Sequence, residues 1–420
     1  MARTSISWAP AVAMSLVLLT AAPVAQAEPD EGPLGKYQDY PVGTNSGNWY
    51  DNRHRVGSWS AMDRVWGLPH RDVPRGTSVT PLPMAPEQAA IRYRFRNIGY
   101  SLDDYLERRR VTGLLILKDG QVVVERYRYE RTPDARFLSF SMAKSVISML
   151  VGIALDNGVI ASLDDPAEKY AKDLAGSAYG STPIRHLLRL SSGLTFTERY
   201  DGNDDVQRMA YAQSTGRPPV LDVLRSITDR HSPSGEKFVY ASAETEILGR
   251  VLAGATGRSV AQLTSEWLWQ PLGAERDAFW ITGQDGQERA SGFFNATLRD
   301  WGRLGWMMAR DGRVGDQQVV PREYVLDATD PARQPDPFKP RRASSYFGYG
   351  YQFWLFPMRE RTFGFQRVHG QAVFVQPGSG IVMVQTAVFD AASGLQDPVP
   401  GQERDAFWRG VLLSLGGTTD

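Results

Sequence analysis

The chain has 420 residues, and its 47 lysines and arginines balance 47 aspartates and glutamates, so its formal net charge is zero. Without an excess of one sign of charge it has no general means of attracting DNA, RNA or an acidic membrane surface, and we expect no nucleic-acid partner. The sequence contains no cysteine, which excludes thiol nucleophiles, disulfides and thiolate metal sites.

The first 27 residues have the order of a secretory signal peptide. Arg3 supplies a positive charge, an apolar run extends from Ala11 to Ala25, and Ala25-Gln26-Ala27 provides the small residues that a signal peptidase accepts. We predict cleavage after Ala27 and a periplasmic or secreted protein. A membrane anchor is the alternative, but the apolar core is short for a bilayer span, and no later segment approaches about 18 consecutive apolar residues. We therefore expect no membrane contact after cleavage.

The N-terminal third is predicted to change from irregular to regular structure. Residues 28–85 are rich in Gly, Pro, Asp and Trp with weak periodicity, which indicates an extended segment that wraps the main body. Residues 86–109 have a helical pattern in parts. Val111–Glu130 is predicted to be a β-hairpin, because Asp119-Gly120 between apolar runs is a strong signal for a two-residue turn.

The middle of the chain is predicted to be mostly helical. Residues from Ser141 to Asn157 are apolar on nearly every side of a helix, which indicates a buried helix. Further helices are predicted over 183–190 and 242–255. Thr297-Leu298-Arg299-Asp300 resembles a capping box, with Asp in place of the usual Glu, and opens a helix that continues to Met308.

The C-terminal part returns to strands, predicted over 349–356, 372–376 and 381–389, before a final helix at about 402–415. Strands early and late with helices between them predict an α+β fold. Both ends of the chain would build one antiparallel sheet with helices on its faces. We expect one domain over 86–420, with an α/β part at about 86–160 and 290–420 and a helical part at about 161–289.

Several common catalytic motifs are missing from the sequence. It contains no G-x-S-x-G nucleophile elbow, no H-E-x-x-H zinc motif and no Gly-Lys-Ser/Thr phosphate loop. The five histidines are scattered, with no pair at metal-ligand spacing. We therefore predict neither a metal nor an organic cofactor.

Ser141-Met142-Ala143-Lys144 opens the apolar helix. Residues at i and i+3 lie on one helix face, with Cβ atoms about 5–6 Å apart. A serine hydroxyl is a weak nucleophile until a base takes its proton, and burial favours the neutral amine that lysine needs for this task. The alternative is a helix-capping serine with a lysine that reaches solvent. Ser234 and Lys237 have the same spacing but lie in a polar stretch, which we interpret as a loop.

Two further motifs are candidates for the same chemistry. Tyr240-Ala241-Ser242 precedes a predicted helix, where a tyrosine can pass protons, although a buried structural tyrosine is the alternative. Val368-His369-Gly370-Gln371 precedes the strand at 372–376. Gly370 permits close approach of a backbone, and the N–H groups of Gln371 and Ser141 would form an oxyanion hole. A lone histidine such as His369 is more often structural or exposed than catalytic.

In this order the three motifs resemble the serine β-lactamase and penicillin-recognising hydrolase superfamily. The similar branch is the class C-like one, which includes β-lactamase-fold carboxylesterases and 6-aminohexanoate-dimer hydrolase. Longer segments carry the same resemblance, and it extends over residues 85–415: FSMAKSVISMLVGIALDNGVIASLDDP, IRHLLRLSSGLTF and ATLRDWGRLGWMMARDG.

The resemblance implies a role for each candidate residue. Ser141 would be the acylated nucleophile, Lys144 its base partner and Tyr240 a second base or proton relay. Gln371 would supply the second oxyanion donor. Substrate contacts are expected from Tyr200, in the segment TERYDGNDDV, and from the loop residues His369 and Gly370.

The sequence departs from the β-lactamases and peptidases of this group at two motifs. Ser242 stands in place of the Asn of Y-x-N, and Val368-His369-Gly370 stands in place of K-T-G, so no lysine there binds a substrate carboxylate. We therefore predict a serine hydrolase that acts on small-molecule esters or small linear amides. The alternatives are a β-lactamase or penicillin-binding D-Ala-D-Ala carboxypeptidase, and a catalytically silent binding or sensor module, against which the intact Ser, Lys and Tyr argue.

Overall fold

The computed structural model describes residues 29–366 and 368–420, and the predicted signal peptide lies outside these residues. The main sheet has seven strands: β4 (Val111–Lys118), β5 (Gln121–Tyr127), β11 (Gly348–Tyr349), β12 (Trp354–Leu355), β13 (Phe363–Gln366), β14 (Ala372–Gln376) and β15 (Ile381–Ala387). A smaller sheet contains β1 (His70–Val73), β6 (Phe137–Leu138), β7 (Ala278–Ile281) and β8 (Phe294–Ala296). Two hairpins pair β2 (Arg92–Phe95) with β3 (Ile98–Ser101) and β9 (Arg313–Val314) with β10 (Gln317–Gln318).

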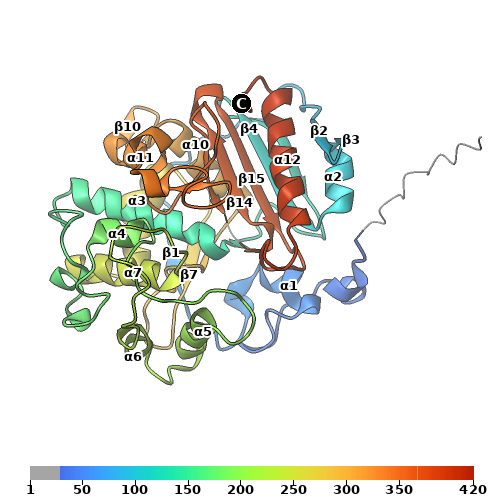
Figure 1. Cartoon of the computed structure of the whole chain (residues 1–420). Coiled ribbons are helices and arrows are strands. Elements are labelled where there is room, and N and C mark those ends of the chain that lie inside the picture. Colours follow the sequence, from blue (N-terminus) through green and yellow to red (C-terminus); the bar gives the residue numbers. More distant parts are fainter. Residues whose placement is uncertain (1–28, 367) are drawn as a thin grey trace, which may run out of the picture.

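Most of the helices come from the part of the chain between β5 and β11, and many of them lie to one side of the main sheet (Figure 1). They are α1 (Asn52–Ser58), α2 (Leu102–Arg108), α3 (Ala143–Asp156), α4 (Ile184–Leu188), α5 (Asp205–Thr215), α6 (Val220–Arg225), α7 (Ser242–Thr256), α8 (Val260–Leu263), α9 (Gln270–Leu272), α10 (Leu298–Ala309), α11 (Arg322–Thr329) and α12 (Val399–Ser414). In the part of the chain that the structure describes, no helix has the length and apolar character needed to cross a bilayer.

The main sheet has the strand order β11-β12-β13-β14-β15-β4-β5, and every neighbouring pair is antiparallel. Strands β4 and β5 come from the first third of the chain, and the other five come from the last fifth. The central pairing joins β15 to β4. Both ends of the chain therefore build one sheet, which confirms the predicted α+β fold.

Alternating side chains of the central strands form a core on each face of this sheet. Leu115 and Leu117 of β4 belong to one core, and Leu114 and Ile116 belong to the other. Because successive side chains of a strand point to opposite faces, the nearly continuous apolar run of β4 is that of a strand covered on both sides. Helix α10 covers one face, and α12 with the β2–β3 hairpin covers the other (Figure 1).

The predicted hairpin between β4 and β5 is confirmed. Asp119 and Gly120 form its turn with φ values of 51° and 79°. Positive φ at both central residues is what a type I′ turn requires, and the Asp-Gly sequence provides it at low cost.

The helical prediction for residues 86–109 is correct only at α2, whose start is capped by Ser101. Before it, β2 and β3 form a hairpin instead. The physical reason is the alternation on β2, where Tyr93 and Phe95 are buried while Arg92 and Arg94 are exposed. A period of two is the signal of a half-buried strand.

The single strand predicted over 349–356 is also wrong, because the structure has β11 and β12 joined by a turn. Gln352 in this turn has φ 65°. Its side chain donates to the carbonyls of Leu187 and Leu188 and accepts from Thr245. Contacts of the Gln352 side chain with α4 and α7 therefore stabilise a turn at the point where the sequence predicted a continuous strand.

The predicted buried helix is present as α3, preceded by a short 3-10 turn over Phe140–Met142. Every α3 residue from Ala143 to Ala154 is buried. Helix α3 packs against α7 and against the π-helical segment Thr264–Trp269. The start of α3 is thereby held in the interior, beside the start of α7.

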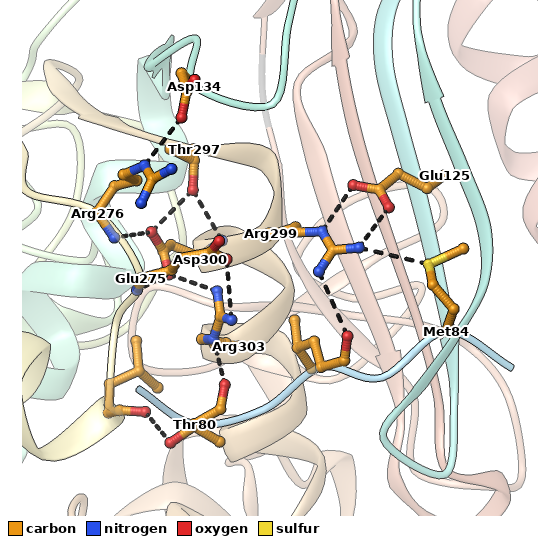
Figure 2. A network of polar contacts seen from close by, with 12 residues as sticks. Thr80, Met84, Glu125, Asp134, Glu275, Arg276, Thr297, Arg299, Asp300 and Arg303 are labelled. Atoms are coloured by element: carbon orange, nitrogen blue, oxygen red, sulfur yellow. Dashed lines mark hydrogen bonds and ion pairs between the residues drawn. The ribbon is translucent and has the colours of Figure 1, made fainter. Parts of the chain in front are cut away.

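A buried ion pair anchors the first turn of α10 (Figure 2). The Asp300 carboxylate contacts the Arg303 guanidinium at 2.9 Å, and the two side chains are 0% and 2% exposed. The same carboxylate accepts the backbone N–H groups of Glu275 and Arg276 at 2.8 and 3.1 Å. Burial raises the pKa of Asp300, against the opposing effects of Arg303 and of these hydrogen bonds.

The predicted start of this helix is confirmed by Thr297, whose hydroxyl accepts the N–H of Asp300 at 3.2 Å. Arg299 forms a two-pronged ion pair with Glu125 of β5, at 2.7 and 2.8 Å (Figure 2). Arg303 also donates to the carbonyl of Thr80 in the N-terminal segment, at 2.8 Å. The network therefore fixes α10 to the sheet and to the segment that precedes it.

Candidate active site

Ser141 lies in the tight 3-10 turn that connects β6 to α3. Ser139 joins this turn to β8, because its N–H donates to the carbonyl of Phe294 at 2.8 Å and its hydroxyl accepts the N–H of Phe294 at 3.1 Å. Phe140 then adopts a positive φ of 43°, which is strained for a residue with a Cβ. Ser141 follows directly and is 9% exposed. The turn thus presents Ser141 at the buried start of α3.

Lys144 is in the interior, with 1% exposure. Its Nζ donates to the hydroxyl of Ser242 at 2.9 Å and lies 5.3 Å from the centre of the Tyr240 ring. The structure therefore brings three residues of the predicted motifs together, from α3 and from the start of α7. The alternative of a lysine that reaches solvent does not describe this side chain.

Tyr240 stands immediately before α7, where the sequence placed it. Its ring stacks on Trp354 of β12, with centroids 5.8 Å apart and planes inclined by 15°. Tyr349 and Phe238 contact it edge-on at 6.5 Å. These aromatic contacts orient the ring with Lys144 within cation–π distance.

Glu198 joins the cluster, and the sequence motifs had not identified it. Its carboxylate accepts the backbone N–H of Ser242 at 2.8 Å and the Ser242 hydroxyl at 2.9 Å. The hydroxyl of Tyr200 also donates to it. The predicted substrate-contact residue Tyr200 is therefore linked to Lys144 through Glu198 and Ser242. No spacing rule in the sequence points to Glu198.

The loop before β14 lies beside the turn that contains Ser141, because the His369 ring is 5.5 Å from the ring of Phe140. His369 and Gly370 both have positive φ, 56° and 89°. A Cβ at position 370 would lie 2.7 Å from the ring of Phe389, so only glycine fits this close approach. The backbone N–H of Gln371 makes a long hydrogen bond of 3.4 Å to the carbonyl of Val368.

Both ring nitrogens of His369 are used within the protein. Nδ1 contacts the carbonyl of Phe389 at 2.7 Å, and Nε2 contacts the hydroxyl of Tyr50. Because the carbonyl can only accept, Nδ1 carries the proton and the Tyr50 hydroxyl donates to Nε2. Burial lowers the pKa of His369 to about 3, so the ring is neutral. His369 thus connects the loop to the N-terminal segment.

The N-terminal segment contributes directly to the site, beyond the wrapping role that its sequence indicated. The ring of Tyr50 meets Phe140 edge-on at 6.4 Å, and Trp59 meets it at 4.8 Å. The indole of Trp59 also lies 4.8 Å from the His369 ring. The aromatic side chains at positions 50 and 59 therefore pack beside the turn that contains Ser141.

A second carboxyl group, which is fully buried, lies near the cluster on the first turn of α7. Glu244 accepts the hydroxyl of Ser192 at 2.7 Å. Its burial raises its pKa to about 8, while the Ser192 hydrogen bonds and the charge of Lys144 act in the opposite direction. The environment of Lys144 thus includes a carboxyl group that is partly protonated near neutral pH.

A surface cavity of about 430 Å³ is lined by Phe238, one of the aromatic residues that contact Tyr240. Its other lining residues are Lys237, Asp336, Pro337, Arg342 and Ala343. The Phe238 ring is 5.8 Å from the ring of Trp354. A larger cavity of about 530 Å³, near Gly254 and Arg258 at the end of α7, includes none of the predicted site residues. Within residues 29–366 and 368–420, no group of three acidic or histidine side chains has the arrangement of a metal site.

Comparison with known proteins places this chain in a family. The family model described as Beta-lactamase matches residues 102–388. The 6-aminohexanoate-dimer hydrolase of Paenarthrobacter ureafaciens is 27% identical over 349 residues, which cover 80% of this chain and 86% of that protein.

Solved structures agree on the fold. A Bacillus anthracis structure provisionally named 6-aminohexanoate-dimer hydrolase matches with a TM-score of 0.76 at 20% identity, over 87% of this chain and 95% of that one. EstCE1, described as a hydrolase with promiscuous acyltransferase activity, matches with a TM-score of 0.55 at 17% identity, over 71% of this chain and 94% of that one. Since the family model covers more than half of the sequence, the chain belongs to the Beta-lactamase family of hydrolases.

Proposed function

We propose that the protein is a serine hydrolase that forms an acyl-enzyme on Ser141 and acts on esters or small linear amides. The observation that carries this proposal is the buried amine of Lys144. Lys144 lies three residues after Ser141 at the buried start of α3. Its amine donates to the hydroxyl of Ser242 and lies within cation–π distance of the Tyr240 ring.

In the first half of the reaction, Lys144 takes the proton of the Ser141 hydroxyl, with Tyr240 as the relay. The Ser141 oxygen then attacks the substrate carbonyl carbon, and the carbonyl oxygen becomes negatively charged. The N–H groups of Ser141 and Gln371 would stabilise this oxyanion. The Gln371 N–H is suited to this task because its present bond, at 3.4 Å, is weak and can be exchanged for a charged acceptor.

In the second half, the proton passes through Tyr240 to the leaving alcohol or amine, and the carbon–oxygen or carbon–nitrogen bond breaks. Water then attacks the ester of Ser141. The same base takes the proton of that water and returns one to the Ser141 oxygen as the acid product leaves. Each group is thus restored, and no cofactor takes part.

Two observations favour esters and linear amides over β-lactams and peptidoglycan peptides. Val368 stands where the related enzymes carry the K-T-G lysine, and the low pKa of the neighbouring His369 leaves that ring neutral, so neither residue provides a cation for a substrate carboxylate. The Paenarthrobacter relative is named for hydrolysing a dimer of 6-aminohexanoate, which is a linear amide. We assign Tyr200 and Gly370 to the substrate side of the site, and we propose that the enzyme is exported after removal of residues 1–27.

A substrate screen tests this proposal. The protein without residues 1–27 would be assayed on short-chain p-nitrophenyl esters, linear amides and a chromogenic cephalosporin, with Ser141→Ala as the matched control. We expect turnover of esters or linear amides that the substitution abolishes, with cephalosporin turnover at least about 100-fold slower. Full activity of Ser141→Ala, or preferred turnover of the cephalosporin, would show that the proposal is wrong.

A further inference from the structure

We propose that Glu198 is a positioning residue for Lys144 and acts through the hydroxyl of Ser242. The inference rests on the proposed function, since it gives Glu198 a task only if Lys144 takes the proton of Ser141. Glu198 lies outside the three sequence motifs, in the segment between Phe196 and α5, and is half-buried.

The first step of the argument is the set of donors around the carboxylate. Oε2 accepts the backbone N–H of Ser242, and Oε1 accepts the hydroxyls of Ser242 and Tyr200. An ionised carboxylate is an acceptor only, so the one hydroxyl proton of Ser242 is directed at Glu198.

The second step follows from the chemistry of a hydroxyl group. With its proton directed at Glu198, the Ser242 oxygen presents its lone pairs to Lys144, and the amine is the donor in their 2.9 Å contact. A neutral amine has two N–H groups and one lone pair. Donation of one N–H to Ser242 keeps the lone pair available for the proton of Ser141. If the hydroxyl were reversed, it would occupy that lone pair.

The third step concerns the frame that holds these groups. The N–H of Ser242 that Glu198 accepts is the first of α7, and Tyr240 lies two residues before it. One carboxylate therefore fixes the start of α7 and, with it, the approach of Tyr240 to Lys144. The titratable groups that face Lys144 from the packed elements are Glu198 through Ser242, the Tyr240 ring, and the buried carboxyl of Glu244.

Glu198→Gln tests this role because it preserves the size of the side chain. The amide oxygen can accept the N–H of Ser242, but the amide nitrogen then donates to the Ser242 oxygen and turns the hydroxyl proton towards Lys144. We expect the rate of Ser141 phosphonylation by a fluorophosphonate probe to fall about tenfold or more. The acidic limb of the rate profile over pH 6–10 should move to lower pH, because a negative charge near Lys144 has been removed.

Asp205→Asn is the matched control. It also removes a carboxylate from this segment, where Asp205 accepts the N–H and the hydroxyl of Thr197, each at 2.8 Å. A general disturbance of the segment would affect both variants, whereas the proposed role predicts a rate and a pH profile near wild type for Asp205→Asn.

Ser242→Ala provides an independent second variant. We expect a similar loss of rate, and little further loss when Glu198→Gln is added to it, because both changes remove the same directed hydroxyl. A wild-type rate and pH profile in Glu198→Gln, a wild-type rate in Ser242→Ala, or the same losses in Asp205→Asn would each overturn the inference. Failure of the proposed function is distinguishable, since the probe would then not label Ser141 in the wild-type protein at all.

Discussion

Two polar clusters of this protein hold a basic side chain in different ways. At the start of α10, the Arg303 guanidinium meets the Asp300 carboxylate directly at 2.9 Å (Figure 2). At the start of α3, the Lys144 amine donates at 2.9 Å to the hydroxyl of Ser242, which stands between it and the Glu198 carboxylate. Both clusters lie at helix starts, and both basic side chains, Arg303 and Lys144, are buried.

The direct ion pair suits a cluster that stabilises the fold, whereas the intervening hydroxyl suits a cluster that takes part in proton transfer. An arginine stays charged in proteins, and a direct carboxylate partner fixes it in place. A lysine can lose its proton when buried, and a hydroxyl can change from acceptor to donor as the proton moves. Disruption of the first cluster should therefore reduce stability, and disruption of the second should reduce reactivity.

The largest effect should come from substitution of Ser141, whose proton Lys144 is proposed to take. Ser141→Ala removes the nucleophile, and we expect kcat/KM on the best ester to fall about 10⁴-fold or more. Thermal unfolding should change little, because only one oxygen is lost. The two measurements are steady-state kinetics and the melting temperature. If the melting temperature fell so far that loss of folded protein explained the fall in kcat/KM, Ser141 would have a structural role instead.

Lys144→Met sharpens the comparison further. The substitution keeps a long buried side chain and removes the base, so we expect kcat/KM to fall about 10³-fold. Because a buried cation is costly to desolvate, the free energy of unfolding should be unchanged or higher. Denaturant unfolding measures the expected change in stability, and ester kinetics measure the expected fall in kcat/KM. Loss of folding with unchanged specific activity in the folded fraction would contradict this assignment.

Asp300→Ala should show the opposite pattern. It leaves Arg303 buried without its carboxylate and removes the acceptor of two backbone N–H groups, which should cost about 3 kcal/mol of unfolding free energy. The control is Asp134→Ala at the exposed rim of the same network, where the ion pair with Arg276 should contribute less than about 1 kcal/mol. Denaturant unfolding of both variants measures the two losses of unfolding free energy. Equal losses would show that the Asp300–Arg303 pair does not anchor α10.

The smallest effect is a pH dependence that comes from His369. Its folded pKa of about 3 lies below the ordinary value of about 6.5, so the unfolded chain binds more protons between these pH values. Below about pH 6.5 the free energy of unfolding should therefore fall, by about 1.4 kcal/mol per pH unit from this group. Urea unfolding at pH 7, 6 and 5 should show a shallower fall in His369→Asn. Parallel curves for the two proteins would refute the prediction.

The sequence predicted best where a local rule determines the structure. The Asp119-Gly120 turn, the all-round apolar α3 and the Thr297 cap each depend on near neighbours, and all three are confirmed. The errors lie where contacts from distant segments decide. The turn at Gln352 is fixed by α4 and α7, which lie far away in the sequence.

The candidate site divides in the same way. The spacing of Ser141 and Lys144 placed both at one helix start, and the structure brings the Tyr240 ring to Lys144. Glu198 and Tyr50 reach the site through contacts between distant segments, including their hydrogen bonds to Ser242 and to His369. Such partners have no fixed spacing from the motifs, so the sequence alone could not identify them.

The central claim is that Ser141 carries the acyl group during turnover. Acid quenching of the wild-type protein during hydrolysis of its best ester, followed by mass spectrometry of the peptides, tests this claim directly. We predict that the mass of the acyl group is found on the peptide that contains Ser141 and is missing in Ser141→Ala. An adduct on another residue, or steady turnover with no adduct at Ser141 when deacylation is rate-limiting, would contradict the account.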